Sequence, residues 1–188
     1  MNKGFAVALL LTGIMSVSGA FAQSDTMAAE TASEAEALLQ VPAENYREEW
    51  ILLGSFSVLA DDPEEGAKQL HVVYAEPATV DAYRRTGAFP DGAVLVKEVL
   101  STKTEALTTG IVSYAQRLVG RFVMVKDAGN IYVDKSPLWG DGWGWAFYEG
   151  SETRKTVTTD YRKDCLGCHE PARSQDLVYV QGYPILNR

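Results

Sequence analysis

The chain has 188 residues, of which 46% are hydrophobic and 22% are charged, with 25 acidic against 17 basic side chains. This length and apolar content fit one globular domain and exclude a disordered or a fibrous protein. The acidic excess argues against nucleic acid as a partner, because its phosphates would be repelled. Only two cysteines and two histidines are present, which excludes a multi-disulfide scaffold and a four-cysteine zinc domain.

The first residues have the pattern of a secretory signal peptide. Lys3 precedes an apolar run over residues 5–15, and Ala20-Phe21-Ala22 has the small-x-small form of a cleavage site. The apolar run is too short for a membrane-spanning helix. We expect cleavage after Ala22, export to the periplasm and no membrane insertion of the mature chain; an uncleaved anchor is the alternative.

Three segments are expected in the chain. Residues 1–22 are the signal peptide, and residues 23–40, rich in Ala, Glu, Ser and Thr, form a loose leader. Residues 41–188 form the folded domain, in which we find no internal repeat.

Short apolar runs separated by turn signals predict the elements of this domain. Pro77 suits the first turn of a short helix that Gly87 ends. Segments 100–118 and 150–170 fit neither helix nor strand clearly. Most connections are too short for helical crossovers, so we expect an α+β fold, mainly an antiparallel β-sheet with a few flanking helices. The expected strands are, in chain order, residues 46–59, 69–74, 93–100, 119–125 and 143–148.

The last of these strands alternates strictly. Trp143, Trp145 and Phe147 share one face, opposite Gly144 and the other small residues. An aromatic core layer explains this pattern, and so does a wall against a large flat ligand.

Cys165-Leu166-Gly167-Cys168-His169 is the attachment motif of c-type haem. Two thiols three positions apart can reach the two vinyl groups of the porphyrin, and the adjacent imidazole supplies an axial nitrogen to the iron. A zinc site lacks a fourth ligand unless His71 supplies it, and a thioredoxin-like pair would need a βαβ setting. A disulfide between these cysteines would close a strained small ring. One covalent haem c is the expected cofactor.

A second axial ligand is not evident. Residues 170–188 contain no Met or His, so a sixth ligand would have to come from His71, Met124, Met27 or a lysine. The simplest expectation is an iron with one protein ligand, His169, and an open face. Open iron binds or transforms small molecules instead of only passing electrons.

Several stretches together resemble the cytochrome P-460 family, which also includes the cytochromes c′-beta, over roughly residues 41–188. The late position of the haem motif, joined to the Asp-Gly-x4-Lys-Glu stretch, is the more specific part of the resemblance. The resemblance implies an antiparallel sheet with flanking helices, a homodimer, and oxidation of hydroxylamine to nitrogen oxides with electrons passed to an acceptor cytochrome c. The matching stretches are Asn45-Tyr46-Arg47-Glu48 with Trp50, residues 86–92, Val96-Lys97-Glu98, residues 145–148, the haem motif, and residues 176–179 and 183–186.

The resemblance also implies a role for Lys97. In the cytochromes P-460, a lysine in the matching position bonds covalently to a meso carbon of the haem. From the residues alone, alternation places Lys97 on an apolar face with Leu95 and Val99, where burial would lower its pKa and leave a nucleophilic neutral amine. The alternative is a lysine that extends to solvent or pairs with a carboxylate such as Glu98.

A base near the open iron face would help hydroxylamine oxidation, because protons are released with the electrons. Glu149 and Asp164 are candidates, with surface solvation as the alternative for each. His71 shares a strand face with Gln69 and Val73 and is a further candidate, or a simply hydrogen-bonded histidine. No single residue is assigned as the base.

Phe89 lies in the turn that matches the family's Thr-Gly-x-Phe. An aromatic cap over the iron would favour nitric oxide or carbon monoxide over polar substrates, as the resemblance to cytochromes c′-beta implies. A turn-anchoring core phenylalanine is the alternative. Three functions therefore compete: a hydroxylamine-oxidising enzyme, a nitric oxide-binding module and a plain electron carrier with both axial sites filled.

Overall fold

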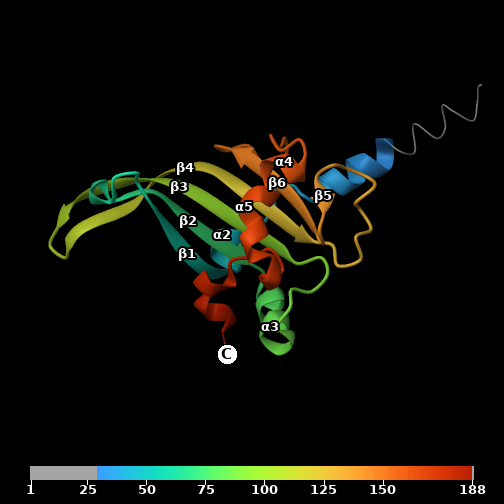
Figure 1. Ribbon diagram of the computed structural model, residues 1–188, viewed down its shortest axis with the longest axis horizontal. Coiled ribbons are helices and arrows are strands. Elements are labelled where there is room, and N and C mark those ends of the chain that lie inside the picture. The colour runs from blue at the N-terminus through green and yellow to red at the C-terminus, as the bar shows by residue number, and fades with distance from the viewer. Residues whose placement is uncertain (1–28, 188) are drawn as a thin grey trace, which may run out of the picture.

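A six-stranded antiparallel sheet forms the centre of the computed structural model, which describes residues 29–187 (Figure 1). Its strands lie in the order β1-β2-β3-β4-β6-β5. Short helices flank the sheet, so the predicted α+β class is confirmed. The strands are β1 (Ile51–Leu59), β2 (Ala67–Ala75), β3 (Val94–Leu107), β4 (Gly110–Lys126), β5 (Trp139–Gly140) and β6 (Trp143–Glu149).

The longest of the labelled helices has the ends that the sequence predicts. Helix α3 (Pro77–Thr86) begins at its proline and ends at Gly87, whose φ of 77° is the left-handed conformation that glycine adopts readily. The other helical segments are single turns or little more. These are α2 (Tyr46–Glu49), α4 (Tyr161–Asp164), α5 (Leu166–His169), and the 3₁₀ helices η1 (Pro63–Glu65), η2 (Glu170–Gln175), η3 (Val180–Gly182) and η4 (Pro184–Leu186).

Two element boundaries differ from the prediction. Residues 46–49 are helical, and the first strand begins only at Ile51. The helical turn directs the buried Tyr46 toward the sheet, where its hydroxyl donates to the carboxylate of Glu98. The ambiguous segment 100–118 forms the outer halves of β3 and β4, which extend as one long hairpin beyond the rest of the sheet (Figure 1).

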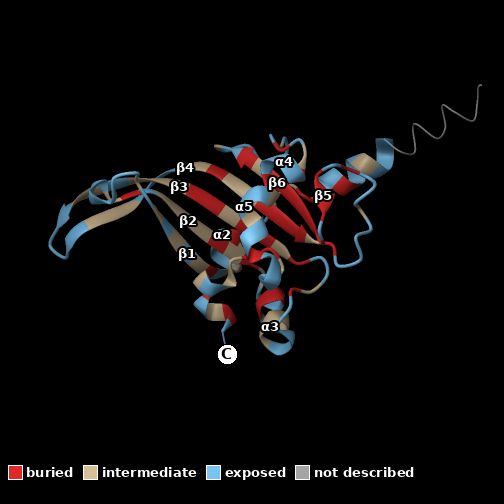
Figure 2. Cartoon of the chain, in the orientation of Figure 1, coloured by how far each residue is buried: buried red, intermediate tan, exposed pale blue. Residues whose placement is uncertain are grey.

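The two faces of the sheet carry separate apolar cores. One face is covered by a helix over residues 29–37 and by α2, which bury Val96 and Val123. The other face carries Trp143 and Trp145 and is covered by α4, α5 and the C-terminal segment. In Figure 2, α5 crosses the part of the sheet where buried residues gather on β3, β4 and β6, and α5 itself is partly exposed. The haem motif therefore lies over the face that also carries Lys97.

The expectation of a loose leader over residues 23–40 is corrected for its last part. Ala35 and Leu39 are fully buried. The indole of Trp139 donates to the Ala35 carbonyl at 3.2 Å, and the Tyr148 hydroxyl donates to the Leu39 carbonyl at 3.0 Å. The folded unit therefore begins before residue 41. The predicted signal peptide and its cleavage site lie outside the described residues, within which no helix is long and apolar enough to cross a membrane.

Candidate functional site

A cavity of about 650 Å³ lies between the sheet and the segments that cover it. Side chains from β1, β2, β3, β4 and β6 form one wall. The haem motif and the C-terminal residues Val178, Tyr179 and Tyr183 form the other. Most of the lining is apolar, and the volume is within the usual range for ligand pockets of about 300–1,000 Å³.

His169 is oriented by a backbone acceptor. Its Nδ1 lies 2.7 Å from the carbonyl oxygen of Leu177, which can only accept, so Nδ1 carries the proton and Nε2 is left as a ligand atom. Its ring packs edge-to-face on Trp145, with centroids 4.8 Å apart. Burial lowers the pKa of His169, partly opposed by the Leu177 hydrogen bond, which favours the neutral ligand form.

The two cysteines line the same cavity in different environments. Cys165 is buried and Cys168 is exposed, and they are not joined as a disulfide. Burial raises the pKa of Cys165 to about 11, so this thiol is protonated at neutral pH. Because α5 is only one turn long, both thiols and the imidazole of His169 are brought to one wall.

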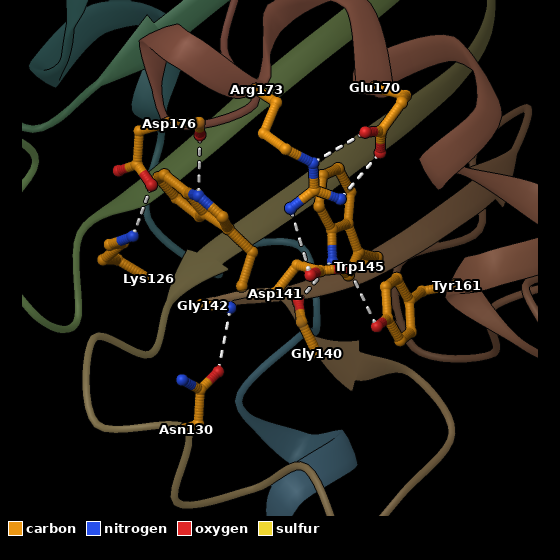
Figure 3. Close-up of polar contacts among 11 residues, drawn as sticks. Lys126, Asn130, Gly140, Asp141, Gly142, Trp145, Tyr161, Glu170, Arg173 and Asp176 are labelled. Atoms are coloured by element: carbon orange, nitrogen blue, oxygen red, sulfur yellow. Dashed lines mark hydrogen bonds and ion pairs between the residues drawn. The ribbon is translucent and has the colours of Figure 1, made fainter.

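Polar contacts attach the residues on either side of the haem motif to the sheet (Figure 3). Arg173 binds Glu170 at 2.7 Å and Asp141 at 3.2 Å. The Tyr161 hydroxyl donates to the Asp141 carboxylate at 3.1 Å, and the Trp145 indole donates to the Gly140 carbonyl at 3.2 Å. The turn between β5 and β6 thus holds both ends of the haem motif.

Lys97 lies in the cavity on β3, on the opposite face from Glu98. Its ammonium nitrogen is 4.2 Å from the Phe122 ring centroid. Burial lowers its pKa, partly opposed by the nearby Cys168 and Cys165. No described residue forms an ion pair with it, whereas Glu98 binds Arg47 at 2.7 Å. The structure thus places both predicted haem-facing elements, Lys97 and the motif, in one cavity.

The matching profile covers residues 43–180, well over half the chain, and describes cytochrome P460. The chain belongs to the cytochrome P460 family. No curated protein matches it. The family implies a haem cofactor, in agreement with the sequence motif. The question is then whether the residues that line the cavity fit a haem.

The residues fit a haem. Two thiols at the haem-attachment spacing, an imidazole with Nε2 available and an apolar cavity meet at one place. Trp145 and Phe147 from the aromatic strand line this cavity, while Trp143 packs in the adjoining core. Trp145 is 2% exposed and belongs to the same core as Trp143, so the core-layer interpretation holds for both tryptophans. Trp145 and Phe147 also stand where a flat ligand in the cavity would contact them.

The other predicted residues are distributed around the site. Asp164 lines the cavity, but its carboxylate accepts from the backbone nitrogens of Thr159 and Asp160 at 2.7 and 3.2 Å, which lower its pKa. Glu149 is exposed at the end of β6 and does not line the cavity. Phe89 is buried, and its ring centroid lies 4.6 Å from that of Tyr83 and 5.6 Å from that of Trp143. Phe89 therefore packs in the core and does not line the cavity.

Among the possible sixth ligands, His71 and Met124 line the cavity, and Met27 lies outside the described residues. Nε2 of His71 lies 3.0 Å from Oε1, the side-chain amide oxygen of Gln69. Because that oxygen can only accept, Nε2–H donates to it and Nδ1 is an acceptor. Burial, with a contribution from Lys97, lowers the pKa of His71 to about 4. His71 is therefore neutral at pH 7, with a lone pair on Nδ1.

Sequence reasoning did not identify three contributors: the Leu177 carbonyl, Tyr179 and Tyr183. Tyr179 donates to the Cys168 carbonyl at 2.6 Å. Tyr183 lines the cavity and packs on Phe56 with centroids 5.8 Å apart. A backbone acceptor has no sequence signature, and two tyrosines in a short C-terminal segment do not differ from ordinary core residues.

Proposed function

We propose that this protein is an exported c-type haem oxidoreductase that oxidises hydroxylamine to nitrogen oxides. In this proposal, one haem is attached through Cys165 and Cys168, with His169 as its axial ligand. The observation that carries the proposal is Lys97, which shares one cavity with the haem motif and has no carboxylate partner within residues 29–187.

The environment of Lys97 supports a covalent bond from its amine nitrogen to a meso carbon of the haem. In this step the N–C bond replaces the meso C–H bond, two protons are released, and the two electrons pass to an added oxidant of the peroxide class. A buried amine with a lowered pKa is neutral more often than an ordinary lysine, and the neutral form is the nucleophile. No described carboxylate holds it in the charged form. The face-on Phe122 ring contacts the ammonium but offers it no proton acceptor.

The haem would supply the redox chemistry when bound, and the chain supplies orientation, an apolar cavity and a hydrogen-bond acceptor. The Leu177 carbonyl holds His169 in the tautomer that presents Nε2. Apolar side chains form most of the cavity lining. Nδ1 of neutral His71 can accept a hydrogen bond from a small molecule in the cavity, while Nε2–H remains bonded to Gln69.

Optical spectra of the purified protein test the proposal, recorded for the ferrous form and for the ferric form before and after hydroxylamine is added. A strongly red-shifted Soret band of the ferrous protein is the expected sign of the lysine link. Because hydroxylamine gives up electrons when it is oxidised, reduction of the ferric haem by hydroxylamine, followed by reoxidation with an added electron acceptor, is the expected sign of turnover. Mass spectrometry of a tryptic digest should recover the haem peptide joined to the Lys97 segment. A haem peptide without that segment, in a protein that does not react with hydroxylamine, would exclude this function.

A second candidate is a module that binds nitric oxide or carbon monoxide without turnover, similar to the cytochromes c′-beta. It is favoured by the stacked Phe122 and Phe147 rings in the cavity, with centroids 4.3 Å apart. Among residues 29–187, Asp164 is the one carboxylate that lines the cavity, and its Oδ2 accepts from backbone donors. This function predicts an ordinary c-type spectrum that shifts with nitric oxide, whereas a plain electron carrier predicts a low-spin spectrum that does not shift.

Export, a homodimer and transfer of electrons to an acceptor cytochrome c belong to the same proposal. Haem c is attached outside the cytoplasm, and the N-terminal sequence pattern agrees with export. The excess of 25 acidic over 17 basic residues suits a basic acceptor guided by electrostatic attraction. Mass determination of the secreted protein and light scattering would test the cleavage after Ala22 and the dimer.

A further inference from the structure

The backbone that orients His169 is left-handed at two successive residues. Asp176 has a φ of 58° and Leu177 a φ of 62°. Aspartate tolerates this conformation, but a leucine rarely adopts it. Leu177 is also the residue whose carbonyl accepts the His169 Nδ1 proton at 2.7 Å. Uncommon backbone geometry therefore lies where the chain contacts the proposed axial ligand, and such geometry persists only when its surroundings hold it.

Two side chains from the sheet hold this turn, one at each end of Asp176. The Lys126 ammonium lies 2.7 Å from the Asp176 carboxylate (Figure 3). The Trp143 indole donates to the Asp176 carbonyl at 2.9 Å. Lys126 also lies 4.8 Å above the Trp143 ring centroid, so the two side chains support each other. The Lys126 side chain is only 10% exposed, which limits its screening by solvent.

We propose that Lys126 and Trp143 clamp Asp176, so that the Leu177 carbonyl stays against His169 and lowers the reduction potential of the iron. They are positioning residues, and the inference rests on the proposed haem ligation by His169. A carbonyl acceptor on Nδ1–H makes the imidazole a stronger electron donor, which favours ferric iron. Without the clamp, the turn can relax toward ordinary backbone angles and withdraw the carbonyl.

Lys126→Met in the haem-loaded protein is the decisive variant, because two explanations predict opposite signs. Loss of a nearby positive charge alone would lower the reduction potential. Release of the clamp should raise the reduction potential. We expect the ferrous-to-ferric ratio at a fixed potential to increase about tenfold, which corresponds to about 59 mV for one electron. Resonance Raman spectra of the ferrous protein should show a lower iron–histidine stretching frequency. Lys126→Arg, which keeps the ion pair, should restore both values.

Asp176→Asn is the second variant and covers a failure of Lys126→Met to fold. Asparagine also tolerates the left-handed conformation, so this change removes the ion pair without adding backbone strain. It should lower the stretching frequency as well. Lys103→Met is the matched control: the same replacement on the same sheet breaks only the Lys103–Glu105 ion pair in the outer part of β3, and should leave the frequency unchanged.

The outcomes separate this inference from the proposed function. If the spectrum of pyridine-treated wild-type protein shows no haem c, both the proposed function and the clamp are overturned. Haem c in the wild type, with an unchanged stretching frequency in Lys126→Met and Asp176→Asn, would overturn the clamp alone. A potential that falls in Lys126→Met would also overturn it, because charge would then account for the effect.

Discussion

Lys97 on β3 and Phe122 on β4 are paired across the sheet, and the ammonium nitrogen of one lies 4.2 Å from the ring centroid of the other. The contact explains how a lysine is tolerated on an apolar face without a carboxylate. Cation–π attraction offsets part of the cost of burying the charged form, and it does so without an ion pair to a carboxylate. The adjacent residue, Glu98, points to the opposite face and is fully engaged there.

Lys97→Arg should separate haem attachment from the lysine link. A guanidinium stays charged at all accessible pH values, so it is not a nucleophile, but it can keep the contact with Phe122. We expect normal covalent haem, a Soret band without the red shift and loss of hydroxylamine oxidation. Digestion and mass spectrometry, with Lys103→Arg as a control on the same strand, check this. A cross-linked haem in Lys97→Arg would show that another residue forms the link.

His71 should make the protein less stable as the pH falls from about 6.5 to about 4. In this window the unfolded chain binds a proton that the folded chain, with a His71 pKa of about 4, does not. After a discount for partial exposure, the loss is on the order of 1–2 kcal/mol. Thermal melting of the wild type and His71→Gln across this range measures it. Parallel pH profiles for the two proteins would contradict the prediction.

Glu98→Ala should be strongly destabilising although the residue lies outside the cavity. Glu98 is 2% exposed and accepts from the Tyr46 hydroxyl at 2.5 Å and from Arg47 Nε at 2.9 Å. Removing it leaves these two donors without this acceptor and Arg121 without its ion-pair partner, at a cost of about 2–4 kcal/mol. Urea unfolding measures the change. Lys103→Ala, which removes an exposed ion pair with Glu105, should leave the urea midpoint almost unchanged, because solvent screens that pair.

Gly54→Ala should disturb the wall formed by Tyr183. A Cβ at Gly54 would lie 2.0 Å from the Gly182 carbonyl oxygen, which is backbone and cannot rotate away. The C-terminal segment would have to move off β1, which we expect to cost about 1–3 kcal/mol. Gly87→Ala meets no atom within 4 Å but has a φ of 77°, so it tests backbone strain alone. Comparing the haem spectra of the two variants shows whether the cavity wall has moved.

Much of the site could be predicted from local sequence. The strand around Lys97 shows in the alternation of side chains along it. The haem motif shows in the short spacing of Cys165, Cys168 and His169. The same local reasoning assigned residues 46–49 to a strand, because Tyr46 and Trp50 are aromatic and the tertiary contact of Tyr46 with Glu98 is invisible in sequence. It also left the long β3–β4 hairpin undecided, since its outer halves are stabilised mainly by each other.

By itself, the sequence determined which groups carry chemistry: a haem-attachment motif, one lysine on an apolar strand face and few other candidate ligands. Only the tertiary structure decided what surrounds them, because that depends on segments far apart in the chain. It brought Lys97 and His169 into one cavity, left Glu149 at the surface and buried Phe89 beside Tyr83. It also placed the Leu177 carbonyl on the imidazole and Lys126 on Asp176, because backbone acceptors and left-handed turns acquire a role only when folding brings a partner to them.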